Sequence, residues 1–204
     1  MKIIKYSSFY YFNIAKEIVH SCNNKKKINI FISGGRTVEK VLKNFGKICK
    51  EKIKVNFYLV DERITFNSKL TNKYKLDKVI SFKNNSLKCN VFSLENSLNT
   101  NADIKNYLKK MSNIKFDLSI ISLAKDGHVA SIEYQNISDR KFNNKNYQVI
   151  DNFIKKPKKR FTLTLKKISS AKDCWLLIDN KKKFTFFKKN NLRRYFSKFS
   201  IYTK

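Results

Sequence analysis

Short apolar runs alternate along the chain with stretches in which apolar residues recur at helical spacing. The apolar runs predict buried strands at residues 28–32, 55–60, 91–94, 116–123 and 174–178, and residues 161–165 alternate with threonines like a half-buried strand. Helical spacing predicts helices around residues 14–19, 38–45, 71–79 and 102–111. This alternation predicts an α/β fold, a doubly wound and mainly parallel sheet with helices on both faces, as in Rossmann-like proteins.

Polar motifs follow three of the predicted strands directly. Gly34 and Gly35 separate a strand from a helix, where glycine lets a ligand approach the backbone and the free N–H groups favour an anion such as phosphate. Residues 61–63 and 126–128 follow two further strands. Because parallel sheets bind ligands beyond the carboxyl ends of their strands, we expect the three motifs to meet in one crevice. The alternative for the glycines is an ordinary tight turn.

Two side chains in these motifs have suitable chemistry. Arg63 can clamp a phosphate or stabilise a developing oxyanion, and His128 can take a proton from water while Asp126 orients its ring. The plainer alternatives are a solvated charged loop for Arg63 and a helix-capping or core role for His128. The other histidine, His20, lies in an amphipathic helix and is assigned to structure.

Length and composition limit the number of domains and the kinds of partner, but they do not identify a reaction. The 204 residues fit one domain, so we expect residues 1–204 to form it, and 42% hydrophobic content supports a folded core. The net charge of +30 comes from 39 Lys and only 6 Arg, spread from Lys2 to Lys204. This profile favours AT-rich coding drift over a specific nucleic-acid partner, which would use clustered arginines. The positive field still attracts an anionic ligand.

The remaining composition predicts no metal, cofactor or membrane partner. The four cysteines contain no C-x-x-C pair, and the two histidines lack metal-ligand spacing. No segment approaches the roughly 20 apolar residues of a spanning helix, and no leader sequence is evident, so we expect a cytoplasmic protein. The sequence leaves the oligomeric state open, with a monomer as the simplest expectation.

Five motifs in order resemble the 6-phosphogluconolactonase family, a branch of the glucosamine-6-phosphate isomerase/deaminase-like group. The resemblance covers residues 28–183. The motifs are Ser33-Gly34-Gly35 with Thr37 (S-G-G-S-T), Asp61-Glu62-Arg63 (D-E-R), Thr71-Asn72 (S-N), Asp126-Gly127-His128 with Ala130-Ser131 (D-G-H-x-A-S), and Lys156-Pro157 with residues 160–164 (K-P-P-x-R-I-T-L-T).

The resemblance implies hydrolysis of 6-phospho-D-glucono-1,5-lactone in the oxidative pentose phosphate pathway, without metal or cofactor. It implies that His128 activates water, that Asp126 supports it, and that Arg63 contacts substrate or oxyanion. The substrate and its phosphate would be held by a second group of residues. This group comprises Gly34, Gly35, Arg36, Thr37, Asp61, Arg160 and Lys183.

Three alternatives remain open, two of them because of departures from the family pattern and the third because of the net charge of +30. Residues 122–124, Ser-Leu-Ala, replace G-M-G, and Arg36 replaces a small serine, which allows a catalytically decayed sugar-phosphate binder. Glu133 stands five residues after His128, as a glutamate does in glucosamine-6-phosphate deaminases, although Arg63 and the residues after His128 favour the lactonase. The third alternative is a basic nucleic-acid-binding protein on the same fold.

Overall fold

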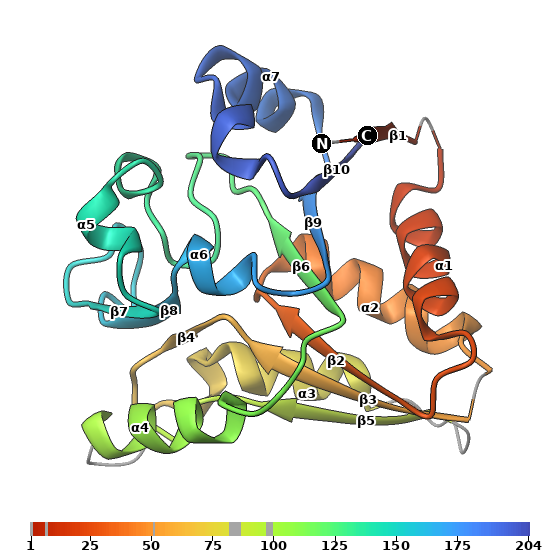
Figure 1. The fold of residues 1–204 in the computed structure, drawn as a ribbon, viewed down its shortest axis with the longest axis horizontal. Coiled ribbons are helices and arrows are strands. Elements are labelled where there is room, and N and C mark those ends of the chain that lie inside the picture. Colours follow the sequence, from red (N-terminus) through yellow and green to blue (C-terminus); the bar gives the residue numbers. More distant parts are fainter. Residues whose placement is uncertain (1, 7, 51, 82–86, 97–99) are drawn as a thin grey trace.

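A seven-stranded parallel sheet forms the centre of the computed structural model, which describes residues 2–6, 8–50, 52–81, 87–96 and 100–204. Every neighbouring pair of its strands is parallel (Figure 1), so the predicted fold class is confirmed. The strands, in spatial order, are β1 (Ile3–Lys5), β10 (Ser200–Thr203), β9 (Asp173–Ile178), β6 (Leu118–Ser122), β2 (Lys27–Ile32), β3 (Ile53–Leu59) and β5 (Leu87–Phe92).

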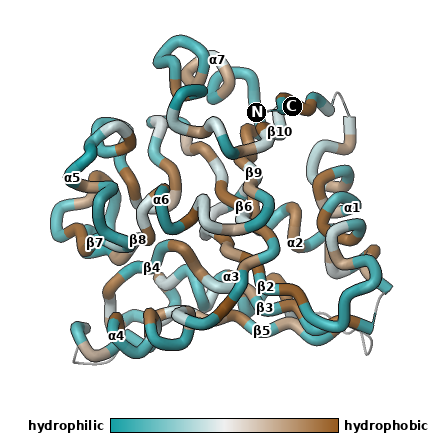
Figure 2. The backbone as a smooth tube through the Cα atoms, viewed as in Figure 1, coloured by the Kyte–Doolittle hydropathy of each residue, from teal (hydrophilic) through white to brown (hydrophobic). Residues whose placement is uncertain are grey.

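Side chains of the central strands alternate between two hydrophobic cores, one on each face. Ile30 and Ile32 of β2 belong to one core and Phe31 to the other, as a period of two requires. Buried side chains of α1 (Tyr10–Cys22), α2 (Arg36–Ile48) and α3 (Asn72–Ile80) complete the first core. The second core takes buried residues from α4 (Thr100–Met111), α6 (Leu165–Ile168) and α7 (Lys181–Lys189). Figure 2 shows hydrophobic segments at the inner strands and hydrophilic ones on the outer loops.

The chain reverses its direction of winding between β2 and β6, which are adjacent in the sheet. From β2 it proceeds outward through β3 and β5, and from β6 it proceeds the opposite way through β9 and β10. In such sheets the crevice at the reversal, beyond the carboxyl ends of the strands, is the usual ligand site. The loops after β2 and β6 therefore lie at this crevice.

A second sheet corrects two details of the sequence-based picture. Residues 61–63, described above as a polar motif after a strand, form the strand β4 (Asp61–Arg63). Two further elements, α5 (Arg140–Asn143) and β7 (Tyr147–Ile150), lie between residues 138 and 159, where the pattern above predicts none. β4 and β7 flank β8 (Arg160–Leu163) in antiparallel order. The sequence predicted β8, but it missed β4 and β7, which are only 3 and 4 residues long and are stabilised by pairing with β8 rather than by a pattern of their own.

Both ends of the chain form strands that the sequence pattern did not predict, and these strands, β1 and β10, pair with each other at one edge of the main sheet. Figure 1 shows the N and C ends side by side there.

The predicted strand at 91–94 is displaced, since β5 begins at Leu87 and ends at Phe92. Short 3-10 segments are also present among the described residues: η1 (Ser68–Leu70), η2 (Tyr134–Asn136) and η3 (Leu192–Phe196). Within the described residues, no helix has the length and apolar character to span a membrane.

Candidate active site

A pocket of about 490 Å³ lies at the predicted crevice. Its walls come from the loops after β2, β6 and β9, from β4 and β8, and from the loop before β8. The lining residues are Gly34, Gly35, Arg36, Thr37, Lys40, Arg63, Ser122, Leu123, Ala124, Lys125, His128, Ala130, Phe153, Lys155, Arg160, Asp179, Asn180 and Lys183. Segments far apart in the sequence thus form one site.

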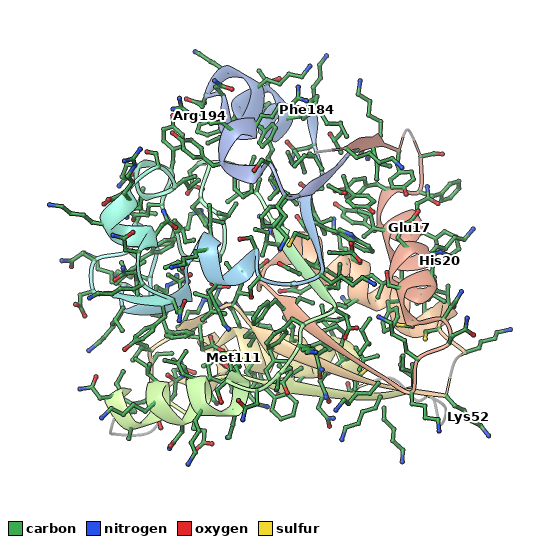
Figure 3. The ribbon with its side chains drawn as sticks, viewed as in Figure 1. Glu17, His20, Lys52, Met111, Phe184 and Arg194 are labelled. Atoms are coloured by element: carbon green, nitrogen blue, oxygen red, sulfur yellow. The ribbon has the colours of Figure 1, made fainter. Side chains whose placement is uncertain are left out.

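Most residues predicted for the site line this pocket. The eight that do are Gly34, Gly35, Arg36, Thr37, Arg63, His128, Arg160 and Lys183. Asp61 and Asp126 are not among the lining residues, and each instead bonds groups close to the wall. The second histidine, His20, is exposed in the last turn of α1 (Figure 3) and is not part of the pocket.

His128 and Asp126 form a hydrogen-bonded pair in the turn after β6. Nδ1 of His128 lies 2.6 Å from Oδ1 of Asp126, and the ring packs edge to face on Phe153 with centroids 5.3 Å apart. Oδ2 of Asp126 forms an ion pair with Lys155 Nζ at 2.8 Å. No hydrogen bond from the described residues engages Nε2. The ring is therefore oriented at one nitrogen while the other remains available to a ligand.

The protonation of this pair suits a base. Burial lowers the pKa of His128 below its ordinary value, with Lys155 acting in the same direction and Asp126 opposing it. Burial would raise the pKa of Asp126, but hydrogen bonds from Lys155 and His128 bring it below its ordinary value. At neutral pH the carboxylate is thus ionised and the imidazole is predominantly neutral, the form that can accept a proton.

The glycine loop leads into the amino end of α2 in the way an anion site requires. Gly35 has a φ of 107°, which L side chains rarely adopt, and no side chain caps the helix. A Cβ on Gly34 would come within 2.3 Å of the Asn72 amide, so a side chain there would displace Asn72. The uncapped N–H groups and the helix dipole favour a negative group at the pocket wall.

Arg63 and Arg160 are brought together by the second sheet, where they are register partners on β4 and β8. Arg160 donates to the carbonyl of Pro157 at 2.7 Å and stacks on Phe153 at 4.6 Å, while Arg63 donates to the carbonyl of Leu70 at 2.8 Å. Burial and the nearby Arg63 lower the pKa of Arg160 to about 10, so it stays protonated at neutral pH. Among the described residues neither arginine forms an ion pair, although Asp61 and Glu62 act on Arg160 at longer range, so both guanidinium groups can pair with an anionic ligand.

The two acidic residues of the D-E-R motif have structural partners. Glu62 is 1% exposed and accepts hydrogen bonds from the backbone N–H groups of Asn72 and Lys73, at 2.6 and 2.8 Å, at the start of α3. Asp61 accepts from Ser131 Oγ at 2.9 Å and from the Asn72 amide at 3.2 Å. Asp61 therefore ties the loops after β3 and β6 to α3 rather than lining the pocket.

Asp179 is a pocket residue that the sequence analysis missed. It follows β9 directly, and its carboxylate pairs with Lys183 Nζ at 2.7 Å and accepts from Thr37 Oγ1 at 2.8 Å. The spacing from Asp179 to Lys183 is that of one helical turn and was readable, but Thr37 is 142 positions away. Lys40, Lys125, Phe153 and Lys155 are further lining residues without a sequence signal.

Some residues that depart from the family pattern line the pocket, and others do not. Ser122, Leu123 and Ala124 all line it, so side chains border the place where the family has glycines. Glu133 is absent from the lining and accepts hydrogen bonds from the Ile154 N–H at 3.0 Å and the Gln135 amide at 2.8 Å. Glu133 thus holds the loop around residue 154.

With this geometry established, sequence comparison settles the family. Residues 10–193 match the profile of the glucosamine-6-phosphate isomerases/6-phosphogluconolactonase family. The chain belongs to this family. A segment of 114 residues is 30% identical to the 6-phosphogluconolactonase of Thermotoga maritima and covers 53% of this chain and 50% of that enzyme. The matched segment therefore spans half the length of that relative.

Solved structures of the family share the fold over almost the whole chain. The Thermotoga maritima 6-phosphogluconolactonase has a TM-score of 0.77 at 23% identity, covering 99% of this chain and 98% of that one. The Plasmodium vivax 6-phosphogluconolactonase has 0.78 at 18%, covering 98% and 88%. A monomeric glucosamine-6-phosphate deaminase has 0.81 at 13%, covering 100% and 97%. Because both kinds of enzyme share it, the fold alone does not identify the reaction.

Proposed function

We propose that this family member hydrolyses 6-phospho-D-glucono-1,5-lactone to 6-phospho-D-gluconate. The observation that carries the proposal is the Asp126–His128 pair, oriented at Nδ1 and with Nε2 available, in a pocket lined by seven lysine and arginine side chains. Ester hydrolysis requires a base, an electrophilic stabiliser and an anchor for the substrate, and the pocket offers a residue for each.

In the proposed mechanism, neutral His128 accepts a proton from water as the water oxygen attacks the lactone carbonyl. The carbonyl oxygen becomes an oxyanion, which Arg63 stabilises from β4. Collapse of the tetrahedral intermediate breaks the ring C–O bond. The imidazolium then returns its proton to the departing ring oxygen and the carboxylic acid ionises, so that His128 ends neutral. Asp126 supports the imidazolium charge through the 2.6 Å contact.

The phosphate would lie at the amino end of α2. The N–H groups beyond Gly34 and Gly35 supply neutral donors, Arg160 supplies positive charge, and Lys183 lines the same wall while paired with Asp179. Arg36 is exposed at the same helix start and can add a further cation from the rim. Thr37 lines this wall, and Asp61 lies behind it, where its Oδ1 accepts a hydrogen bond from the Gly34 N–H at 3.5 Å.

The placement of Glu133 supports the lactonase over the deaminase. A glutamate that serves a deaminase reaction must reach the pocket, whereas Glu133 bonds the backbone of Ile154 and lies outside the lining. Arg63, which occupies the place of the deaminases' usual tyrosine, does line the pocket. We further propose that the chain acts as a single domain in the cytoplasm, without a metal or cofactor.

The decisive experiment measures lactone hydrolysis with the substrate generated in situ and the product followed through coupled 6-phosphogluconate oxidation. We expect His128→Ala to lower the rate by roughly 10²–10⁴-fold, the usual cost of a lost general base. The matched control is His20→Ala, which removes the other histidine from an exposed position and should retain wild-type activity. Wild-type protein that does not exceed the spontaneous rate would contradict the proposal and leave a deaminase or a sugar-phosphate binder.

A further inference from the structure

Asp179 places a negative charge in a pocket whose other charged lining residues are positive. The lining contains seven lysine and arginine side chains, and among the described residues Asp179 is its one carboxylate. The side chain is 14% exposed, so solvent screens it poorly. A negative charge in this position opposes the binding of any anion nearby.

Four side-chain donors fix the carboxylate of Asp179. Oδ2 accepts from Thr37 Oγ1 at 2.8 Å and from the Tyr11 hydroxyl at 3.0 Å. Oδ1 accepts from Lys183 Nζ at 2.7 Å and from the Asn180 amide at 3.1 Å. Burial alone would raise the pKa of Asp179, but the bonds from Lys183, Thr37 and Tyr11 lower it below its ordinary value. Asp179 is therefore ionised at neutral pH.

The hydroxyl of Thr37 has a single proton, and an ionised carboxylate can only accept one. Thr37 therefore donates its proton to Asp179 and has none left for a phosphate oxygen. Lys183 has three protons and can serve both groups, but its charge is already compensated at 2.7 Å. Two of the residues predicted to hold phosphate are thus engaged by the protein's own anion.

We propose that Asp179 is a specificity-determining residue that occupies the Thr37–Lys183 side of the anion site and limits its affinity for dianionic ligands. The inference rests on the proposed function only in taking the anion to be a substrate phosphate. It predicts that removal of the carboxylate's charge strengthens anion binding, with Thr37 becoming a donor to the ligand. A residue that merely positioned Lys183 would give the opposite result on removal.

The test is calorimetric titration with inorganic phosphate at neutral pH and fixed ionic strength. Asp179→Asn should lower the Kd for phosphate by about tenfold, the scale expected for removing a nearby like charge. Asp179→Glu keeps the charge and should stay close to wild type. The matched control is Asp151→Asn, which removes a carboxylate that is 71% exposed outside the pocket and should leave the Kd unchanged. Weaker binding by Asp179→Asn would overturn the proposal.

Thr37→Val gives an independent test that leaves Asp179 in place. In the wild-type background this change should alter the phosphate Kd by less than about twofold, because the Thr37 proton is engaged by Asp179. In the Asp179→Asn background it should weaken binding by about fivefold or more, since Thr37 then donates to the ligand. A large loss in the wild-type background would refute the proposal. Neither titration requires turnover, so failure here is distinguishable from failure of the lactonase proposal.

Discussion

Two lysine–carboxylate pairs belong to the site, and they differ in burial and in what else they contact: Lys155 lines the pocket and pairs with Asp126, whereas Asp179 and Lys183 both line it. Asp126 and Lys155 are 33% and 53% exposed and 2.8 Å apart, whereas Asp179 and Lys183 are 14% and 10% exposed and 2.7 Å apart. The distances are nearly equal, but the second pair is far less accessible to solvent. Coulomb interactions weaken steeply with solvent access, so the buried pair is the stronger constraint.

What else each carboxylate contacts decides its effect. Asp126 also contacts His128 and so supports a proposed base, while Asp179 also accepts from Thr37 and so removes a donor from the proposed phosphate wall. The same pair of charged groups therefore assists one step and restrains another. The effect of an ion pair in a ligand pocket therefore depends on which further group its carboxylate contacts.

The two ion pairs are expected to differ most in how much they contribute to the free energy of unfolding. Lys183→Met leaves the Asp179 carboxylate buried without its cation and should lower the free energy of unfolding by about 3 kcal/mol. Lys155→Met breaks an exposed pair and should cost less than about 1 kcal/mol. Urea denaturation of both variants measures the difference. Equal losses would show that burial does not distinguish the two pairs.

The next contrast concerns the two carboxylates in catalysis. Asp126→Asn removes the charge that supports imidazolium and should lower kcat for lactone hydrolysis by about 10²-fold with little change in KM. Asp179→Asn should instead lower KM. Steady-state kinetics of the two variants separate these outcomes. A fall in kcat for Asp179→Asn as large as that for Asp126→Asn would remove the distinction.

The turn that carries Asp126 and His128 depends on Gly127. This residue has a φ of 85°, and a Cβ would come within 2.3 Å of Phe186, so Gly127→Ala should cost about 2 kcal/mol through strain and overcrowding. Gly35 has the same sign of φ but no atom within 4 Å of the added Cβ, so Gly35→Ala should cost only about 1 kcal/mol. Thermal unfolding compares the two, and a smaller loss at Gly127 would contradict the packing argument.

The smallest expected effect is electrostatic. The charge of Lys155 lowers the pKa of His128, so Lys155→Gln should raise the pKa of His128. Because His128 acts in its neutral form, the acid limb of the pH–rate profile should then move to higher pH. NMR titration of the His128 ring measures this directly. Lys159→Gln removes a similarly exposed lysine of the same loop, paired with Asp151 at 3.8 Å, and should leave the His128 midpoint unchanged. An unchanged His128 midpoint in Lys155→Gln would show that Lys155 does not influence the base.

The elements that the sequence predicted are those whose pattern is long enough to be unambiguous. The strand at 116–123 and the helix at 38–45 correspond to β6 and α2 within a few residues. β1 and β10 were missed because 3 or 4 residues carry too little periodicity, and pairing across almost the whole chain stabilises them. Strand order was likewise not readable, since it depends on contacts between distant segments.

The sequence by itself predicted the Asp126–His128 pair, because only Gly127 separates the two residues and a turn there can bring their side chains together. It also placed the glycine loop at a helix start, since a strand and a helix flank it. Only the tertiary structure decided that Arg160 meets Arg63, that Lys155 reaches Asp126, and that Asp179 takes the proton of Thr37. Arg63 and Arg160 are register partners on two paired strands, and the partners in the other two contacts lie 29 and 142 positions apart, so only the tertiary fold brings each pair together.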